Sequence, residues 1–469
     1  MSPREGGRRV ASPALTVYRR LSGAARSAMA RDAGKLGIGG AIVLVSGVAQ
    51  AIIVARALGP RDFGIAALIL SFPPLVFTFF DAQAAEAVVK YLGQFMVARD
   101  RSKALAVPKL AYTVDIGLAL LGFLVVAASS PWVGQHLLGT GGYVELLLLV
   151  AGTQVIVAPA DTSRAILTSF GRFSGVARVT GAAAILRLGL VVALVGSGGG
   201  IAAYVVATCA GTAFESLLMG WLANRAVRDA LGGSWWTGRL ADVRGSVREM
   251  GWFLLYTDLS SLVGVFVKQA DIVILGMVAG PVQTGYYRLA RSLATPATSV
   301  ITTLQAVLYP QVARLAATGD AAALMRRARR WCLLGGVPLA AASLVVFPFA
   351  PQVIRLLSGD DFVGATAAAR WLLAGSAFVL TCFWLRPIQL ATGQVRFMFL
   401  NGVVLGVVSV ASFFALGGPF GAAGVAAART VVAGVGGTSA GLWRLRSLSR
   451  SGRLVAGPEP ASPPVALVS

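Results

Sequence analysis

The chain alternates between long apolar blocks and short polar segments in which arginine is frequent. Each apolar block holds about twenty residues, the length that an α-helix needs to cross a hydrocarbon core of roughly 30 Å. The pattern therefore predicts an all-α membrane protein with about 12 transmembrane helices. The expected helices cover residues 36–57, 64–81, 108–130, 144–167, 175–196, 200–223, 251–275, 285–313, 333–355, 367–390, 397–417 and 421–443.

The composition agrees with burial in lipid. Hydrophobic residues make up 56% of the chain and charged residues only 13%, against roughly 25% in soluble domains. The net charge of +22 would favour nucleic-acid binding in a soluble protein, but here the basic residues lie between apolar blocks, where they contact anionic membrane lipids. No nucleic-acid partner is expected. With one histidine, His136, and three cysteines without shared spacing, no metal site or cofactor is expected.

The distribution of lysine and arginine predicts the side of the membrane on which each loop lies. Of the 41 basic residues, 31 fall in alternate loops and the two terminal segments, whereas three fall in the intervening loops. Cytoplasmic loops carry the excess of positive charge, so both termini are expected in the cytoplasm and the helix count is even. Five lysines against 36 arginines, with abundant alanine and glycine, indicate a bacterial source and hence a bacterial cytoplasmic (inner) membrane.

Three short motifs recur in the same order in the two halves of the chain, at offsets of 221, 224 and about 221 residues. This recurrence predicts two homologous halves of six helices each. Because six is even, both halves enter the membrane from the same side, which predicts parallel repeats as in some secondary transporters. The motif pairs are LGPRDFGI (58–65) with AGPVQTGY (279–286), ILTSFGRF (166–173) with LATGQVRF (390–397), and GGGIAAYVVA (198–207) with PFGAAGVAAA (419–428).

These observations predict two six-helix lobes with no sizeable domain outside the membrane, so the function is expected to lie within the bilayer. The segment after residue 450 carries four prolines, which is typical of a disordered tail. The expected segments are a basic cytoplasmic lead-in (1–35), an N-terminal lobe (36–223), a cytoplasmic linker (224–250), a C-terminal lobe (251–445) and a disordered cytoplasmic tail (446–469).

Three motifs resemble those of bacterial polysaccharide flippases. They are ARALGPRDFG (55–64) after the first helix, LRLGLVVAL (186–194), and KQADIVILGMVAGPVQTGYYRLARSL (268–293). Over about residues 30–445 the chain resembles the polysaccharide/O-antigen flippase family of the multidrug/oligosaccharidyl-lipid/polysaccharide exporter superfamily. The motifs favour the polysaccharide branch over the drug-exporter branch and do not specify the sugar.

The resemblance implies a V-shaped pair of six-helix lobes around a central cavity that opens alternately to the cytoplasm and the periplasm. It implies a flippase, not an enzyme, that turns undecaprenyl-pyrophosphate-linked oligosaccharide from the inner to the outer leaflet for lipopolysaccharide or exopolysaccharide export. A polysaccharide polymerase and glycosyltransferases are the candidate protein partners.

Charged residues inside the predicted helices are the candidates for the site, because such residues are costly in lipid and usually face a cavity or a partner. A pyrophosphate needs positive charge and hydrogen-bond donors in place of water, and the planar guanidinium of arginine binds phosphate oxygens in pairs. The candidate substrate-binding residues are Arg291, Arg288, Lys268, Arg56 and Arg386. Of these, Arg56 is included because the flippase motif contains it.

Acidic residues in these segments are candidates for ion coupling or for charge pairing, and they are Asp271, Asp81 and Glu86. Asp271 and Glu86 also have a structural alternative. Lys268 lies three residues before Asp271, and Lys90 lies four residues after Glu86, so both spacings fit ion pairs along one helix face.

The basic candidates also have structural alternatives. Arg288 and Arg291 lie on one helix face, from which both side chains can extend to the membrane surface. Arg56 can anchor a helix end, and Arg386 can bind a carbonyl freed by the following proline. Two further arginines, Arg187 and Arg429, lie within helices without a predicted orientation.

Other function classes agree less well with the sequence. A cation-coupled small-molecule or multidrug antiporter of the same superfamily would prefer acids and aromatics in its cavity, whereas basic residues are at least as numerous here. A membrane enzyme of cell-envelope synthesis would need a substantial external loop, and the longest expected one covers residues 131–143. A non-transporting scaffold would not need repeated lobes with buried charges. The sequence therefore predicts a flippase, with the antiporter as the alternative.

Overall fold

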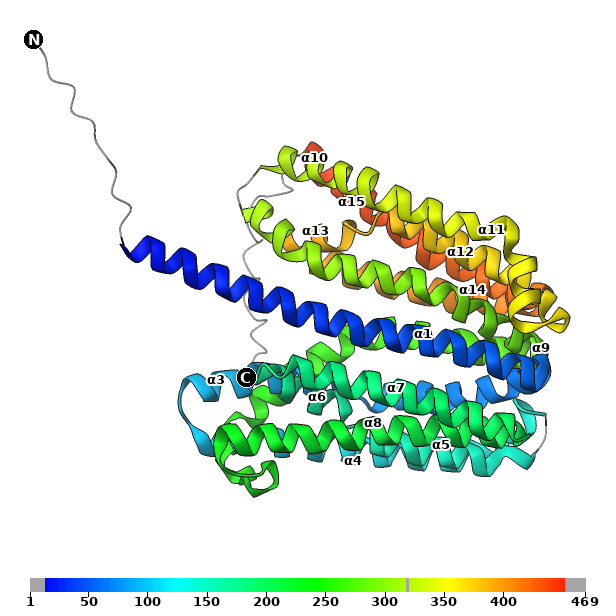
Figure 1. The fold of residues 1–469 in the computed structure, drawn as a ribbon, viewed down its shortest axis with the longest axis horizontal. Helices are drawn as coiled ribbons and strands as arrows, with labels where there is room; N and C mark the ends of the chain where they lie inside the picture. Colours follow the sequence, from blue (N-terminus) through cyan, green and yellow to red (C-terminus); the bar gives the residue numbers. More distant parts are fainter. Residues whose placement is uncertain (1–12, 140, 318–319, 452–469) are drawn as a thin grey trace, which may run out of the picture.

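The computed structural model of the protein describes residues 13–139, 141–317 and 320–451, most of which lie in helices. The two halves of the chain form two groups of helices (Figure 1). Within the described residues, eight helices are long and apolar enough to cross a membrane, and some of them hold two predicted spans. The prediction of an all-α, multi-pass membrane protein with two lobes is confirmed.

The N-terminal lobe contains the first six predicted spans. α1 holds the first two spans and begins at Pro13, so the predicted lead-in is helical from that residue. The fourth span is divided at Pro159, because proline lacks the amide hydrogen that continues a helix. The helices of this lobe are α1 (Pro13–Phe77), α2 (Ala84–Ala87), α3 (Gly93–Val97), α4 (Arg101–His136), α5 (Val144–Val157), α6 (Ala160–Ser169), α7 (Phe173–Gly196) and α8 (Gly200–Leu231), with short 3-10 or π segments at Thr78–Phe80, Val88–Leu92 and Gly141–Tyr143.

The C-terminal lobe repeats this plan. Two 3-10 segments, Trp235–Thr237 and Leu240–Ser246, connect the lobes, and α9 then holds the seventh and eighth spans. The predicted tail from residue 446 begins inside α15, and residues 452–469 lie outside the described part. The helices are α9 (Val247–Ala317), α10 (Ala321–Trp331), α11 (Val337–Ser358), α12 (Thr366–Thr381), α13 (Leu385–Ala391), α14 (Val395–Ala428) and α15 (Gly437–Arg450), with 3-10 or π segments at Cys332–Gly336, Asp360–Ala365 and Arg429–Gly436.

The two halves of the chain share the same backbone conformation at their kinks and turns. Gly59 inside α1 and Gly280 inside α9 occupy equivalent positions of the repeat and share a left-handed φ, 73° and 80°, that glycine adopts without steric cost. Each precedes a proline, so each kink joins two spans in the same way. Two further pairs of equivalent glycines also have a positive φ, namely Gly171 with Gly393 and Gly200 with Gly421.

The structure corrects the register of the second motif pair. The turn at Gly171 and the turn at Gly393 have the same sequence of backbone hydrogen bonds. For example, the amide of Arg172 donates to Leu167 and the amide of Gln394 donates to Gln389. The motif alignment had instead placed Gly171 against Val395. The predicted register was therefore wrong by two residues at this turn, although the existence of the repeat is confirmed.

One pair of equivalent positions was missed in the sequence. The side chain of Asp100 accepts the amide of Lys103 at 3.1 Å at the start of α4, and that of Asp320 accepts the amide of Ala323 at 2.7 Å at the start of α10. Such caps satisfy amides that have no partner within the helix. Because the two caps occupy equivalent positions, the repeat also fixes where the third and ninth spans begin.

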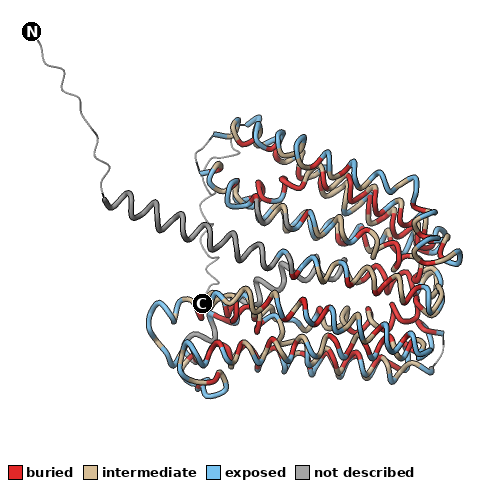
Figure 2. The backbone as a smooth tube through the Cα atoms, viewed as in Figure 1, coloured by how far each residue is buried: buried red, intermediate tan, exposed pale blue. Residues whose placement is uncertain are grey.

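The two lobes share a hydrophobic core at one end, which we call the external end because the distribution of basic residues assigns it to the outside. A single hydrophobic core crosses between the lobes there, for example where the rings of Phe63 and Phe362 lie with centroids 6.0 Å apart. Toward the opposite end each lobe has its own core. Figures 1 and 2 show the lobes converging at the external end, so the described conformation faces inward.

Candidate functional site

A cavity of about 300 Å³ lies where the lobes separate, and we call it the cationic cavity. Arg187 of α7 reaches it from the N-terminal lobe and Arg288 of α9 reaches it from the C-terminal lobe. The remaining polar lining consists of neutral side chains that can donate hydrogen bonds to an anion. They are Gln50, Thr153, Gln154, Tyr204, Thr208, Thr212 and Ser292.

The two arginines of this cavity have no carboxylate partner within 4.0 Å among the described residues. The Nε atom of Arg187 is buried and has no hydrogen-bond partner in that part of the chain. Its side chain lies directly on Gly211 of α8, where an added Cβ would come within 2.6 Å of the Cβ of Arg187. A guanidinium that is half-buried without a counter-charge is costly, so an anion in the cavity would stabilise both side chains.

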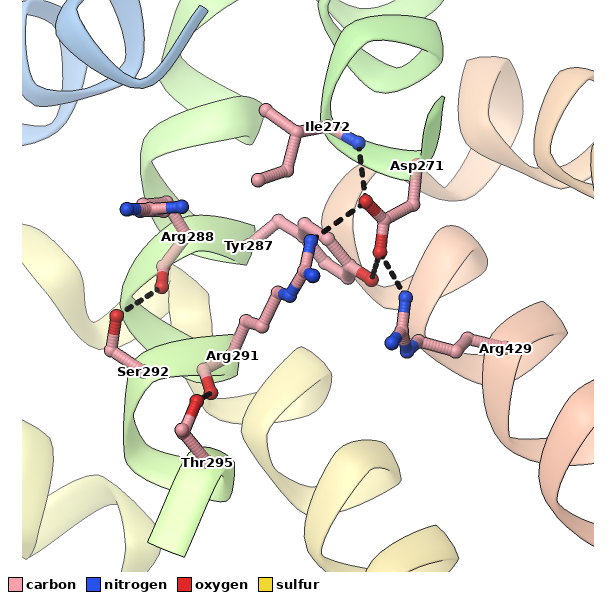
Figure 3. A network of polar contacts seen from close by, with 8 residues as sticks. All are labelled: Asp271, Ile272, Tyr287, Arg288, Arg291, Ser292, Thr295 and Arg429. Atoms are coloured by element: carbon pink, nitrogen blue, oxygen red, sulfur yellow. Dashed lines mark hydrogen bonds and ion pairs between the residues drawn. The ribbon is translucent and has the colours of Figure 1, made fainter. Parts of the chain in front are cut away.

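A second cluster of charge surrounds Asp271 of α9, which is fully buried (0% exposed). Its Oδ1 accepts a hydrogen bond from Arg291 at 2.8 Å, and its Oδ2 accepts one from the hydroxyl of Tyr287 at 2.7 Å. Arg429 also donates to Oδ2, and the amide of Ile272 donates to Oδ1. Figure 3 shows these groups converging on one carboxylate from α9 and from the segment that begins at Arg429.

Arg288 and Arg291, which the sequence places on one helix face, have different surroundings in the structure. Arg291 is paired with Asp271, whereas the guanidinium of Arg288 points away from the cluster (Figure 3) and lines the cationic cavity. Arg291 and Arg429 both contact the carboxylate of Asp271. Both oxygens of Asp271 are occupied by donors, so the carboxylate acts here as a charge partner.

A larger cavity of about 690 Å³ lies next to the cationic cavity, and Gln154 and Val157 line both. We call it the acidic cavity because four carboxyl groups line it, accompanied by one arginine, Arg164. Arg164 pairs with Asp161 at 2.7 Å and lies 3.7 Å from Glu215. The four acidic residues of the lining are Asp81, Glu86, Asp115 and Asp161.

Two of the predicted acidic candidates, Asp81 and Glu86, therefore line the acidic cavity, although they do not lie on one continuous helix. The second span ends at Phe80, and Gln83 adopts a left-handed φ of 46° before α2 begins. Among the described residues, Lys90 contacts Glu249 at 3.9 Å and forms no ion pair with Glu86. The break in the helix exposes Asp81 to the cavity.

The remaining candidates lie elsewhere. Arg56 lies at the external end, where its guanidinium donates to the carbonyl of Leu356 in the other lobe. Arg386 is exposed on α13 and lines neither cavity. The side chain of Lys268 lies outside the described part of the chain, so its pairing with Asp271 stays a prediction.

Two residues of these sites, Arg187 and Arg429, had no predicted role. The repeat contains a signal for Arg429. In the register set by Gly59 and Gly280, the positions equivalent to Asp271 and Arg429 are Gln50 and Thr208, and the Nε2 of Gln50 lies 3.4 Å from the Oγ1 of Thr208. Equivalent helices therefore contact each other at the same point in both lobes, through neutral groups in one and through an ion pair in the other.

For Arg187 no such signal is available. In the register of the turns at Gly171 and Gly393, its equivalent position is occupied by Ser409. Because serine carries no charge, the repeat gives no second ionisable residue from which the orientation of Arg187 could be inferred.

The chain thus combines two repeated lobes with a cavity between them. A family model described as "Polysaccharide biosynthesis protein" matches residues 53–367, and the chain belongs to this family. No curated protein matches the sequence.

The fold is similar to solved structures of transporters. One is a multidrug resistance MATE family transporter of the MOP superfamily in an inward-facing conformation, at 16% identity and TM-score 0.70, covering 87% of this chain and 96% of that one. Another is the lipid II flippase MurJ in an inward closed conformation, at 13% identity and TM-score 0.67, covering 88% and 87%. A MOP superfamily transporter from Pyrococcus furiosus, described as having a binding pocket of reverse polarity, matches at 16% identity and TM-score 0.54, covering 92% and 96%.

Proposed function

We propose that the protein is a flippase that moves undecaprenyl-pyrophosphate-linked oligosaccharide across the bacterial cytoplasmic membrane by alternating access. The observation that carries the proposal is the cationic cavity, in which Arg187 and Arg288 have no carboxylate partner among the described residues. A pyrophosphate that leaves water needs charge-assisted hydrogen bonds, and two guanidinium groups with neutral donors around them supply these. The prenyl tail stays in the lipid while the head group crosses.

The position of the two arginines suggests how binding and movement are linked. Because Arg187 belongs to the N-terminal lobe and Arg288 to the C-terminal lobe, one anion between them attracts both lobes. That attraction favours closure of the inner end and supports a change toward the outward-facing state. Arg56, which contacts Leu356 across the external end, would have to release this contact in the same step.

The other basic candidates take supporting roles in this proposal. Arg291 keeps its position near the cavity through its ion pair with Asp271. Lys268 and Arg386 remain candidates for contacts to the phosphates or sugars as the substrate enters. Asp81 and Glu86, on the acidic cavity, are proposed to take part in ion coupling.

The test is deletion of the gene in its host, followed by measurement of lipid-linked glycan on each leaflet. We expect undecaprenyl-linked oligosaccharide to accumulate on the cytoplasmic leaflet, and wild type to reverse this. Arg187→Gln and Arg288→Gln should fail to restore transport, whereas Arg327→Gln, an exposed site on α10, should restore it. Rescue by both cavity variants would retain the flippase and reject the cationic cavity as its site.

A small-molecule antiporter is the second candidate, and the acidic cavity is the observation that favours it. Four carboxyl groups around about 690 Å³ offer a site for an organic cation. If deletion leaves the lipid-linked glycan unchanged on both leaflets and alters sensitivity to cationic drugs, the antiporter replaces the flippase.

A further inference from the structure

The outer face of the N-terminal lobe carries a groove between α7 and α8, with a volume of about 670 Å³. It lies at the end of the molecule that the distribution of basic residues assigns to the cytoplasm. We call it the α7–α8 groove. It is separate from both cavities of the site, with which it shares no lining residue.

The rim of the groove is basic. Arg172, Arg178 and Arg225 line it, and only Arg172 has a carboxylate partner among the described residues, Asp229 at 2.7 Å. The three arginines and this aspartate leave a formal charge of +2 at the rim. Arg178 and Arg225 are both exposed; the Nε of Arg178 donates to the carbonyl of Ser174 at 3.2 Å, which leaves its terminal nitrogens available to a ligand.

The position of Arg225 is held by an aromatic ring. Its guanidinium carbon lies 5.8 Å from the centre of the Trp221 ring, a cation–π distance, and Trp221 is itself exposed. Tryptophan is enriched at membrane–water interfaces, so this residue marks the level of the lipid head groups. Arg225 also lines a second hollow of about 530 Å³, together with Arg228 among others. Arg225 therefore borders two hollows that can hold a ligand.

The floor of the groove is apolar. Leu167, Leu218 and Leu222 line it below the arginines. Farther along the same helix faces, toward the membrane centre, Ile185 and Leu217 are 59% and 64% exposed, as expected for side chains that contact lipid. A soluble anion would gain nothing from this floor, whereas an acyl chain would be buried along it.

We propose that the α7–α8 groove binds an anionic phospholipid of the cytoplasmic leaflet. The phosphate lies between Arg178 and Arg225, and one acyl chain runs along the leucines toward the membrane centre. The charge of the rim and the apolar floor below it match the two parts of such a lipid, in the order in which the leaflet presents them. A lipid bound here links the α6–α7 turn to α8 within the N-terminal lobe.

The experiment measures lipid binding to the purified full-length protein by native mass spectrometry. Phosphatidylglycerol and phosphatidylcholine of equal chain length are titrated against wild type and Arg178→Gln/Arg225→Gln. Wild type should bind the anionic lipid more tightly. The double variant should lose roughly 30-fold of that affinity, since each basic side chain near an anionic lipid surface raises the affinity roughly fivefold. The matched control is Arg327→Gln/Arg330→Gln, which removes two exposed arginines from α10 at the same end of the molecule.

Three outcomes would overturn the proposal. Equal affinity of wild type for the two lipids would show that the charge of the head group does not contribute to binding. An equal loss in the groove variant and in the control would show general attraction to a basic surface instead of a site. Equal binding of glycerol 3-phosphate and of the lipid would show that the apolar floor plays no part and that the ligand is a soluble anion. None of these results depends on which substrate the protein transports.

Discussion

Gly64 and Gly285 occupy equivalent positions in the two repeats, and each lies directly against the backbone of the other repeat. A Cβ added at Gly64 would overlap the carbonyl of Pro281, and one added at Gly285 would overlap the carbonyl of Pro60. The shared G-P-x-x-x-G motif is therefore the point at which the lobes contact each other at the external end. Only glycine permits this approach, because any side chain would separate the two turns.

Alanine at Gly64 should weaken the inward-facing state. Overpacking of a close contact typically costs about 1–3 kcal/mol, and the lobes can avoid this cost by separating at the external end. We expect a larger outward-facing population. The measurement is the maleimide labelling rate of Thr284→Cys, a fully buried position beside this contact, in protein whose native cysteines are replaced.

The control for this experiment is Gly189→Ala, because a Cβ at Gly189 has no neighbour within 4 Å. It should label as slowly as the parent protein. If Gly64→Ala and Gly189→Ala label at the same rate, the glycine contact does not determine which end of the cavity is closed.

The Asp271 cluster predicts a loss of stability when the carboxylate of Asp271 is neutralised. Asp271→Asn would remove the buried carboxylate that contacts both Arg291 and Arg429, and removing one partner of a buried pair costs about 3–5 kcal/mol. The thermal midpoint of the detergent-solubilised protein should therefore fall. Adding Arg429→Gln should restore part of the loss, since one unpaired charge is then removed.

Asp161→Asn is the matched control for the cluster. The side chain of Asp161 is 75% exposed and its pair with Arg164 lies at a surface, where ion pairs contribute about 0–1 kcal/mol. Equal thermal midpoints for Asp271→Asn and Asp161→Asn would contradict a structural role for the Asp271 cluster.

Much of the fold could be predicted from the sequence because the bilayer constrains the length and the composition of the segments that cross it. Span length, the distribution of arginine and the repeated G-P-x-x-x-G motif predicted the helices, the parallel repeat and the equivalence of the turns at Gly59 and Gly280. The predicted register was wrong at Gly171 and Gly393. The motifs had been aligned on a shared arginine and phenylalanine, which places the two glycines two residues out of register, whereas the turns themselves are equivalent. The aspartate caps at α4 and α10 form no repeated motif, so they went unnoticed.

The site was harder to predict for a physical reason. Membrane helices are apolar on the faces that contact lipid and on those that contact protein, so periodicity does not indicate which way Arg187 or Arg288 points. The pairing of Arg429 with Asp271 joins residues 158 positions apart, which a single sequence does not reveal. Only the repeat register, applied to Gln50 and Thr208, would have indicated that these helices meet.

The acidic cavity predicts a separation between ion coupling and substrate binding. Asp115 is nearly buried and accepts a hydrogen bond from Thr162 at 2.6 Å, so Asp115→Asn keeps the shape of the site and removes its charge. If this cavity holds the coupling cation, transport by Asp115→Asn in proteoliposomes should no longer depend on an imposed proton or sodium gradient. Binding of the pyrophosphate lipid should stay within about twofold of wild type, because the substitution removes no contact to the substrate.

Asp361→Asn, at an exposed external position, should keep the gradient dependence of wild type. A gradient response in Asp115→Asn that matches this control would exclude Asp115 from ion coupling.

The unpaired arginines of the cationic cavity predict the opposite pattern to the Asp271 cluster. Among the described residues, neither Arg187 nor Arg288 is paired with a carboxylate, so their replacement leaves no carboxylate without a partner. Arg187→Gln and Arg288→Gln should therefore keep or raise the thermal midpoint. This is the expected result where a charge serves function at a cost in stability. Each should weaken binding of undecaprenyl pyrophosphate by about tenfold to a hundredfold, since a hydrogen bond to a charged group contributes about 1.5–3 kcal/mol. Binding titration and thermal unfolding on the same preparations check both expectations.

Lysine at either position should restore part of the affinity, because it returns the charge without the planar fork. If the glutamine variants instead lose stability and keep their affinity, the two arginines hold the lobes together and do not bind the substrate.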